Sequence, residues 1–136
     1  MDIGIISQDE RSAAFFDAAA LGTLLIKRCR ACGTWLGPEA GGCPDCGATG
    51  DDGPGWVPAS GRGTLISWAV VYPRPASAGE ALPTVLALVE VDEGPWLHTR
   101  LDTGDPAALH AGDPVQAHFA HPPTGESFPY FRLTRG

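Results

Sequence analysis

The chain is short of basic residues, since nine Lys and Arg stand against 16 Asp and Glu and the formal net charge is −7. Binding to a phosphate backbone depends on cations that displace counterions, so this balance disfavours nucleic acid as a partner. No apolar run approaches the ~20 residues of a membrane-spanning helix, and we expect no membrane partner. The first residues do not read as a secretory signal, so we expect a cytoplasmic protein whose thiols stay reduced.

The sequence also lacks a recognisable catalytic set. None of its four histidines stands near a serine or a spare cysteine in a nucleophile motif. The stretch Gly61-Arg62-Gly63 is not a phosphate-binding loop, because it does not join a strand to a helix. An independent esterase or thioesterase is therefore the weakest interpretation, and we expect a protein without catalytic activity of its own.

Cysteine is scarce but strongly patterned. The chain has four cysteines in two Cys-x-x-Cys pairs separated by ten residues: Cys29, Cys32, Cys43 and Cys46. Each pair can form a tight knuckle that directs two thiolates at one ion, and two knuckles complete the tetrahedron that zinc accepts. Gly33 and Gly47 follow the two pairs at the position where a knuckle needs a positive φ. The pattern predicts a structural zinc site.

Three other uses of these cysteines compete with structural zinc. Two disulfides would need an oxidising compartment, and a redox Cys-x-x-Cys would need one pair in a βαβ context. An iron site of the rubredoxin type has the same spacing and stays open as an alternative. In either metal site four sulfurs saturate the ion, so no position is left for substrate or water.

The N-terminal half reads as a helix followed by a small metal-binding module. Ser7 to Glu10 fits a capping box for a helix that we expect to end near Leu21, with Gly22 as the stop. Residues 23–28 and 35–36 read as the strands of a rubredoxin-like zinc ribbon. Residues 50–55 are all turn-formers or charges, so we place a linker there. The predicted divisions are residues 1–22 (N-terminal helix), 23–50 (zinc ribbon) and 56–136 (OB-fold domain).

The C-terminal half alternates with a period of two, which is typical of strands. In residues 64–72 the apolar set Ile66, Trp68, Val70 and Tyr72 is expected to face the core. Residues 84–91 are apolar on both faces, as in a central strand, and further strands are expected at 96–101, 115–119 and 130–134. Asp105 and Pro106 begin a short helix between the third and fourth strands. The fold class is therefore mainly β, with a five-stranded OB-type barrel.

Taken together, the parts resemble a zinc-ribbon and OB-fold family known as a domain of unknown function and associated with acyl-CoA metabolism. The resemblance covers residues 15–133. It rests on the doubled cysteine pairs, on Ser60-Gly61-Arg62-Gly63-Thr64, and on Val89-Glu90-Val91-Asp92-Glu93-Gly94. Asp105-Pro106, Leu109-x-x-Gly112 and Pro129-Tyr130-Phe131 continue the match.

This resemblance implies an accessory subunit that binds a thiolase-like enzyme and supports its acyl-CoA site. Some members serve thiolase and hydroxymethylglutaryl-CoA synthase pairs. Others partner a lipid-transfer-protein-type aldolase that acts on steroid side-chain CoA esters, with an enoyl-CoA hydratase as a further partner. Of these partners we favour the lipid-transfer-protein-type aldolase. The alternative is a single-stranded nucleic-acid-binding protein, because OB barrels and zinc ribbons are common in that work.

Individual residues were assigned on this basis. Arg62, Lys27 and Arg28 are candidate acyl-CoA ligands, although a local ion pair is the favoured role of Arg62 and charge compensation of the metal site that of the other two. Aromatic residues often anchor interfaces. The residues assigned to partner contact are Phe15, Phe16, Pro75, Tyr130 and Phe131, with core packing favoured for the two N-terminal phenylalanines.

Overall fold

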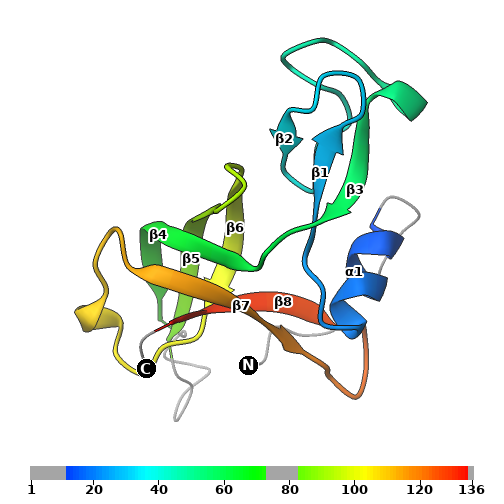
Figure 1. The fold of residues 1–136 in the computed structure, drawn as a ribbon. Coiled ribbons are helices and arrows are strands. Elements are labelled where there is room, and N and C mark those ends of the chain that lie inside the picture. The colour runs from blue at the N-terminus through cyan, green and yellow to red at the C-terminus, as the bar shows by residue number, and fades with distance from the viewer. Residues whose placement is uncertain (1–11, 73–82, 135–136) are drawn as a thin grey trace.

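The computed structural model describes residues 12–72 and 83–134 and shows a mainly β protein in which a short helix and a zinc-ribbon sheet stand beside a closed barrel (Figure 1). The ribbon elements are β1 (Leu25–Cys29), β2 (Trp35–Leu36), η1 (Gly50–Asp52) and β3 (Pro54–Pro58). The barrel elements are β4 (Arg62–Val71), β5 (Thr84–Val91), β6 (Trp96–Leu101), η3 (Pro106–Ala108), β7 (Pro114–Ala120) and β8 (Phe128–Leu133). The predicted fold class is confirmed.

Helix α1 (Ala13–Ala20) lies between the ribbon and one end of β8 (Figure 1). Gly22 follows it with φ +79°, as expected of a helix stop, and Ala19 is its buried residue. The capping box predicted at Ser7 to Glu10 lies outside the described residues. Among the described ones, Ser12 occupies the N-cap position.

The ribbon sheet has the order β2-β1-β3, and both pairings are antiparallel. The prediction that residues 50–55 form an irregular linker is wrong, because these residues form η1 and the start of β3. Strand β3 pairs with the whole of β1, from Leu25 opposite Pro58 to Cys29 opposite Pro54. We therefore propose that the boundary between the modules lies after Pro58, where the chain crosses to the barrel.

The barrel has the strand order β4-β5-β6-β8-β7 and closes on itself. The set of β4 residues expected to face the core is partly wrong, because β4 contains a β-bulge. Leu65 lies opposite Val89 and Ser67 opposite Leu88, so Ile66 is an extra residue and the inward phase of β4 changes there. As a result Leu65 is fully buried, Trp68 and Val70 pack on the core from partly buried positions, and Tyr72 is 73% exposed rather than buried.

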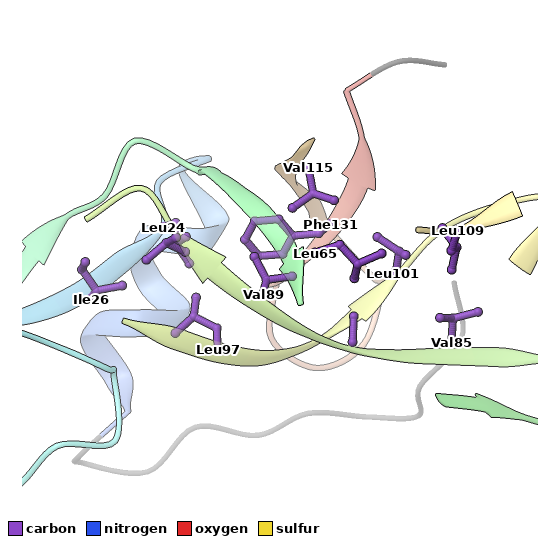
Figure 2. Close-up of a cluster of buried hydrophobic side chains, with 12 residues drawn as sticks. Leu24, Ile26, Leu65, Val85, Val89, Leu97, Leu101, Leu109, Val115 and Phe131 are labelled. Atoms are coloured by element: carbon purple, nitrogen blue, oxygen red, sulfur yellow. The ribbon is translucent and has the colours of Figure 1, made fainter. Parts of the chain in front are cut away.

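One apolar cluster fills the barrel and continues into the base of the ribbon (Figure 2). Phe131 is 1% exposed at its centre, beside Leu65 and Val115. Leu24 and Ile26, from the chain that leads into and along β1, belong to the same cluster. The ribbon is thus anchored to the barrel by shared apolar packing at one end of β1.

Candidate metal centre and apolar cleft

Two short backbone knuckles position the cysteines. The N–H of Gly33 donates to the carbonyl of Cys29, and the N–H of Gly47 donates to that of Cys43, each at 2.8 Å. Both glycines have positive φ, +83° and +77°, a conformation that a side chain makes costly. The two Cys-x-x-Cys-Gly segments therefore fold in the same way, as their identical spacing predicts.

The four Sγ atoms lie within 4.8 Å of one another, and all four cysteines are free. Cys29 and Cys46 are separated by 3.6 Å between sulfurs, as are Cys32 and Cys43. A tetrahedron of sulfurs around a metal at ~2.3 Å has edges of ~3.8 Å, whereas a disulfide measures ~2.05 Å. The four cysteines are therefore positioned to bind a metal ion.

Thr34 supports one of the thiolates. Its Oγ1 lies 3.1 Å from Cys32 Sγ and 2.9 Å from Asp45 Oδ2, and its one hydroxyl proton can be donated to either of these acceptors. Hydrogen bonds from the Thr34 side chain and backbone lower the pKa of the Cys32 thiol to about 6. Cys32 is thus prepared to act as a thiolate, and Thr34 links the first knuckle to the residue between the cysteines of the second.

The opposite holds for Cys46. A backbone hydrogen bond from Ala48 lowers the pKa of this thiol, but the neighbouring Cys29 thiol, desolvation and the other two cysteines together outweigh it and raise the pKa to about 12. Four thiolates this close repel one another unless a cation lies between them. The donor set therefore fits a thiophilic metal and not a metal-free tetrathiolate.

Lys27 and Arg28, the predicted ligand cations on β1, are engaged within the ribbon. Lys27 Nζ donates to the carbonyl of Ala40 at 2.8 Å, and Arg28 Nε donates to that of Gly33 at 2.9 Å. Each cation also lies over an indole ring, that of Trp56 at 4.6 Å for the lysine and that of Trp35 at 4.7 Å for the arginine. Both side chains thereby tie the ribbon loops to its sheet.

Arg62 lies on the barrel instead, at a junction between two stretches that are distant in sequence. Its Nε is 3.6 Å from Asp92 Oδ2, and the Asp92 N–H donates to the Arg62 carbonyl at 2.9 Å. The Ser60 N–H donates to Glu93 Oε2 at 2.7 Å. Gly63 pairs with Val91 just beyond. The Gly-Arg-Gly stretch and the turn after β5 therefore form one joint.

The residues predicted to contact a partner do not form one exposed surface, although Phe15 and Phe131 both line one cleft. Phe15 packs on the barrel cluster and against Phe16, at 5.4 Å between ring centroids. Tyr130 is half-buried and stacks on His118. Phe131 is buried in the core, which argues against its assignment as a contact residue, and Pro75 lies outside the described residues. Phe15, Phe16 and Tyr130 stay predictions.

A cleft of ≈ 730 Å³ lies against β6 and β8, and sequence reasoning missed it. Phe15 and the residues after β2 form one wall, and segments of β4, β5, β6 and β8 form the rest. Leu86 and Trp96 beside it are 45% and 52% exposed. The available signal is the apolar pattern on both faces of residues 84–91, which also fits burial in a central strand.

The described residues contain one serine–histidine contact that the sequence did not indicate. His121 Nδ1 lies 2.8 Å from Ser127 Oγ, in the loop between β7 and β8. His121 is exposed and neither residue lines the cleft. A nucleophile needs an enclosed site with stabilising donors, so this pair does not constitute one.

Comparison with known protein families gives two matches. Residues 16–52 match the rubredoxin-like zinc ribbon domain of ChsH2, and residues 56–120 match its C-terminal OB-fold domain. A chain of the solved Ltp2-ChsH2(DUF35) aldolase superposes with a TM-score of 0.77 and 34% sequence identity, covering 93% of this chain and 96% of that one.

Three curated relatives extend these matches. A probable enoyl-CoA hydratase alpha subunit of Thermomonospora curvata is 36% identical over 89% of this chain and 37% of its own length. The 3-oxo-4,17-pregnadiene-20-carboxyl-CoA hydratase alpha subunit of Mycobacterium tuberculosis is 42% identical over 47% of this chain and 20% of its own length. A DUF35 domain-containing scaffold protein of Methanocaldococcus jannaschii is 28% identical over 71% of this chain and 67% of its own length. The chain thus spans well under half of either hydratase subunit.

Proposed function

Because the chain belongs to the DUF35 family, with the zinc ribbon and OB-fold domains of ChsH2, we propose that it is a non-catalytic scaffold subunit of an acyl-CoA enzyme. Its partner is a thiolase-like enzyme, and a lipid-transfer-protein-type aldolase acting on steroid side-chain CoA esters is the first choice. We assign the complex to the cytoplasm. An enoyl-CoA hydratase is a further partner, in line with the names of two relatives.

The observation that carries this proposal is the extent of the match to a chain of the solved Ltp2-ChsH2(DUF35) aldolase, which covers 93% of this chain and so includes both ribbon and barrel. The chemistry of the metal centre agrees with it. Four cysteines leave a bound ion no open position, so the metal supplies structure and no Lewis acid. We assign zinc to the site, with iron as the alternative.

The nucleic-acid alternative receives less support. An OB-fold that binds single strands has a basic groove with stacking aromatics. The described cleft residues include Arg100 and His98 but also Glu39, in a chain of net charge −7. A filter-binding assay with single-stranded DNA at low salt tests this alternative, and tight, salt-sensitive retention would favour it.

Co-expression with a thiolase-like protein of the same genome tests the proposal. We expect the two chains to co-purify and the complex to process an acyl-CoA substrate, while this chain alone turns over no thioester. A lipase of unrelated fold serves as the control for non-specific association. Thioester turnover by the isolated chain, or failure of every thiolase-like protein to co-purify, would contradict the proposal.

Contact with acyl-CoA is a finer proposal that rests on Arg62, Lys27 and Arg28. Arg62 is the most available of these, because its ion pair with Asp92 is exposed on both sides. Arg62→Gln is expected to weaken acyl-CoA binding by the complex. Arg132→Gln is the matched control, since Arg132 is also an exposed arginine paired with an aspartate, Asp102 at 3.0 Å. Equal effects of the two variants would exclude direct contact by Arg62.

A further inference from the structure

The barrel is closed weakly at one seam, between β6 and β8. These parallel strands share a single register pair, Leu101 opposite Phe131, whereas β5 and β6 share six pairs. The backbone also explains why the ladder ends there. The Phe131 carbonyl faces β6, since it accepts from the Asp102 N–H at 2.9 Å, so by alternation the Pro129 nitrogen faces the same way. Proline has no N–H to donate, and the pairing stops.

The same alternation identifies which groups of β6 face the seam. Val91 N–H donates to the Pro95 carbonyl at 3.0 Å, so the backbone of residue 95 faces β5. Because alternate residues of a strand face the same neighbour, residues 97, 99 and 101 also bond to β5. The backbone N–H and C=O groups of Trp96, His98 and Arg100 therefore face the other edge. The single register pair of Leu101 with Phe131 uses the Asp102 N–H and the Arg100 carbonyl, and within residues 12–72 and 83–134 no strand pairs with Trp96 or His98 on this side.

The cleft runs along this unpaired edge. All five residues from Trp96 to Arg100 line it, together with Phe128 and Pro129 across the seam. The exposed side chains of Leu86 and Trp96 flank it with apolar surface. An open strand edge beside an apolar surface is a template for strand addition, because the donors and acceptors repeat about 6.7 Å apart, as in another strand.

We propose that the β6 edge is a docking strand, on which an extended, largely apolar segment of the partner enzyme adds by backbone pairing to Trp96 and His98. The proposal rests on the scaffold function above and identifies the surface by which the scaffold would bind its partner enzyme. A second copy of the chain is the less suitable occupant, because two bodies of net charge −7 repel each other. Backbone bonds would supply affinity, and the flanking Leu86 and Trp96 would select apolar residues.

A pair of substitutions at one position separates backbone pairing from side-chain contact. His98→Pro removes the N–H that faces the seam but no bond to β5, so the barrel is expected to keep its melting temperature and metal content. It should weaken co-purification with the thiolase-like protein by about tenfold or more. His98→Ala keeps the N–H and should bind like the original chain. Equal binding by the two variants would overturn the docking strand.

Amide hydrogen exchange, resolved by residue in the free chain and in the complex, provides the second test. We expect new protection at Trp96 and His98, while the amides of residues 97 and 99 are protected in both states. A complex that forms without this alternate pattern would overturn the docking strand and leave the scaffold function intact. Absence of any complex would overturn both, and pairing seen between copies of this chain alone would replace the partner with a homodimer.

Discussion

The ribbon and the barrel are stabilised by different means. The barrel cluster contains twelve buried apolar residues, whereas the ribbon cluster consists of Cys29, Leu36 and Cys43 with two alanines packed against it. Two of the three buried ribbon residues are therefore candidate metal ligands. We therefore expect burial of apolar surface to suffice for the barrel and the tip of the ribbon to depend on a bound metal ion for its folding energy.

Strand β1 contributes residues to both the barrel cluster and the ribbon cluster. Ile26 is fully buried in the barrel cluster, and Cys29 at the end of the same strand belongs to the ribbon cluster. The base of the ribbon is therefore fixed by packing and its tip by coordination. This arrangement predicts that losing the metal unfolds one end of the molecule and spares the other.

Removal of a ligand should have the largest effect. In Cys43→Ala the remaining three thiols hold the metal poorly, and structural zinc sites contribute on the order of 10 kcal/mol to folding. We expect the variant to contain less than one metal per chain and to be cut by protease between residues 30 and 53, with the barrel left intact. Elemental analysis and limited proteolysis measure this.

Ala31→Ser is the matched control, because Ala31 is exposed within the first knuckle and supplies no ligand. It should keep the metal and resist protease like the original chain. A Cys43→Ala protein with normal protease resistance would break the comparison, since packing alone would then hold the ribbon.

A cavity in the barrel should have a smaller but still large effect. Leu65 is fully buried, so Leu65→Ala should reduce the free energy of unfolding by about 2–5 kcal/mol, measured in denaturant. Metal content at low denaturant should stay unchanged. Leu21→Ala, at a position 86% exposed, should change stability little. Loss of metal in Leu65→Ala under native conditions would show that the two regions unfold together.

Addition of one methyl group at Gly63 tests the junction between β4 and β5. A Cβ there would meet the Glu90 carbonyl oxygen at 2.7 Å and Val89 Cγ1 at 2.8 Å. Gly63→Ala should therefore destabilise the barrel by about 1–3 kcal/mol. At Gly104 nothing lies within 4 Å, so Gly104→Ala should be tolerated in the same thermal or denaturant assay. Similar stabilities for both variants would exclude this close packing.

The exposed ion pair should matter least to stability. Arg62 and Asp92 are both more than half exposed, so Arg62→Gln should cost about 0–1 kcal/mol in the free energy of unfolding. Melting temperatures at low and high salt measure the effect, which should shrink as salt rises. A loss of several kcal/mol would mean that Arg62 is a structural residue of the barrel and not a charge available to a ligand.

Much of this arrangement could be predicted from local sequence. The spacing of the cysteine pairs and of Gly33 and Gly47 indicated both knuckles, because a knuckle is formed within five residues. Strands β5 and β6 matched their expected bounds, because residues 84–91 are largely apolar and both strands flank a tight turn, but the burial of both faces expected for β5 is wrong at Leu86, which is 45% exposed. Asp105 caps η3 as predicted, accepting from the Ala107 N–H at 3.2 Å.

Features that depend on pairing between distant segments could not be predicted. The bulge at Ile66 is visible only once β4 is aligned with β5, and it changes which residues of β4 face inward. The linker predicted at residues 50–55 includes the first two residues of β3, because Pro54 and Gly55 discourage strand assignment, yet the partner strand β1 imposes the extended conformation. The unpaired edge of β6 likewise follows from the position of β8 and not from β6 itself.

The most direct test of the central claim is amide hydrogen exchange on the purified full chain, with and without a strong zinc chelator. Chelation should expose the amides of residues 29–53 to exchange while the amides of β4 to β8 keep their protection. Loss of protection throughout the chain, or retention of protection in the ribbon without metal, would contradict the separation of a metal-held ribbon from a core-held barrel.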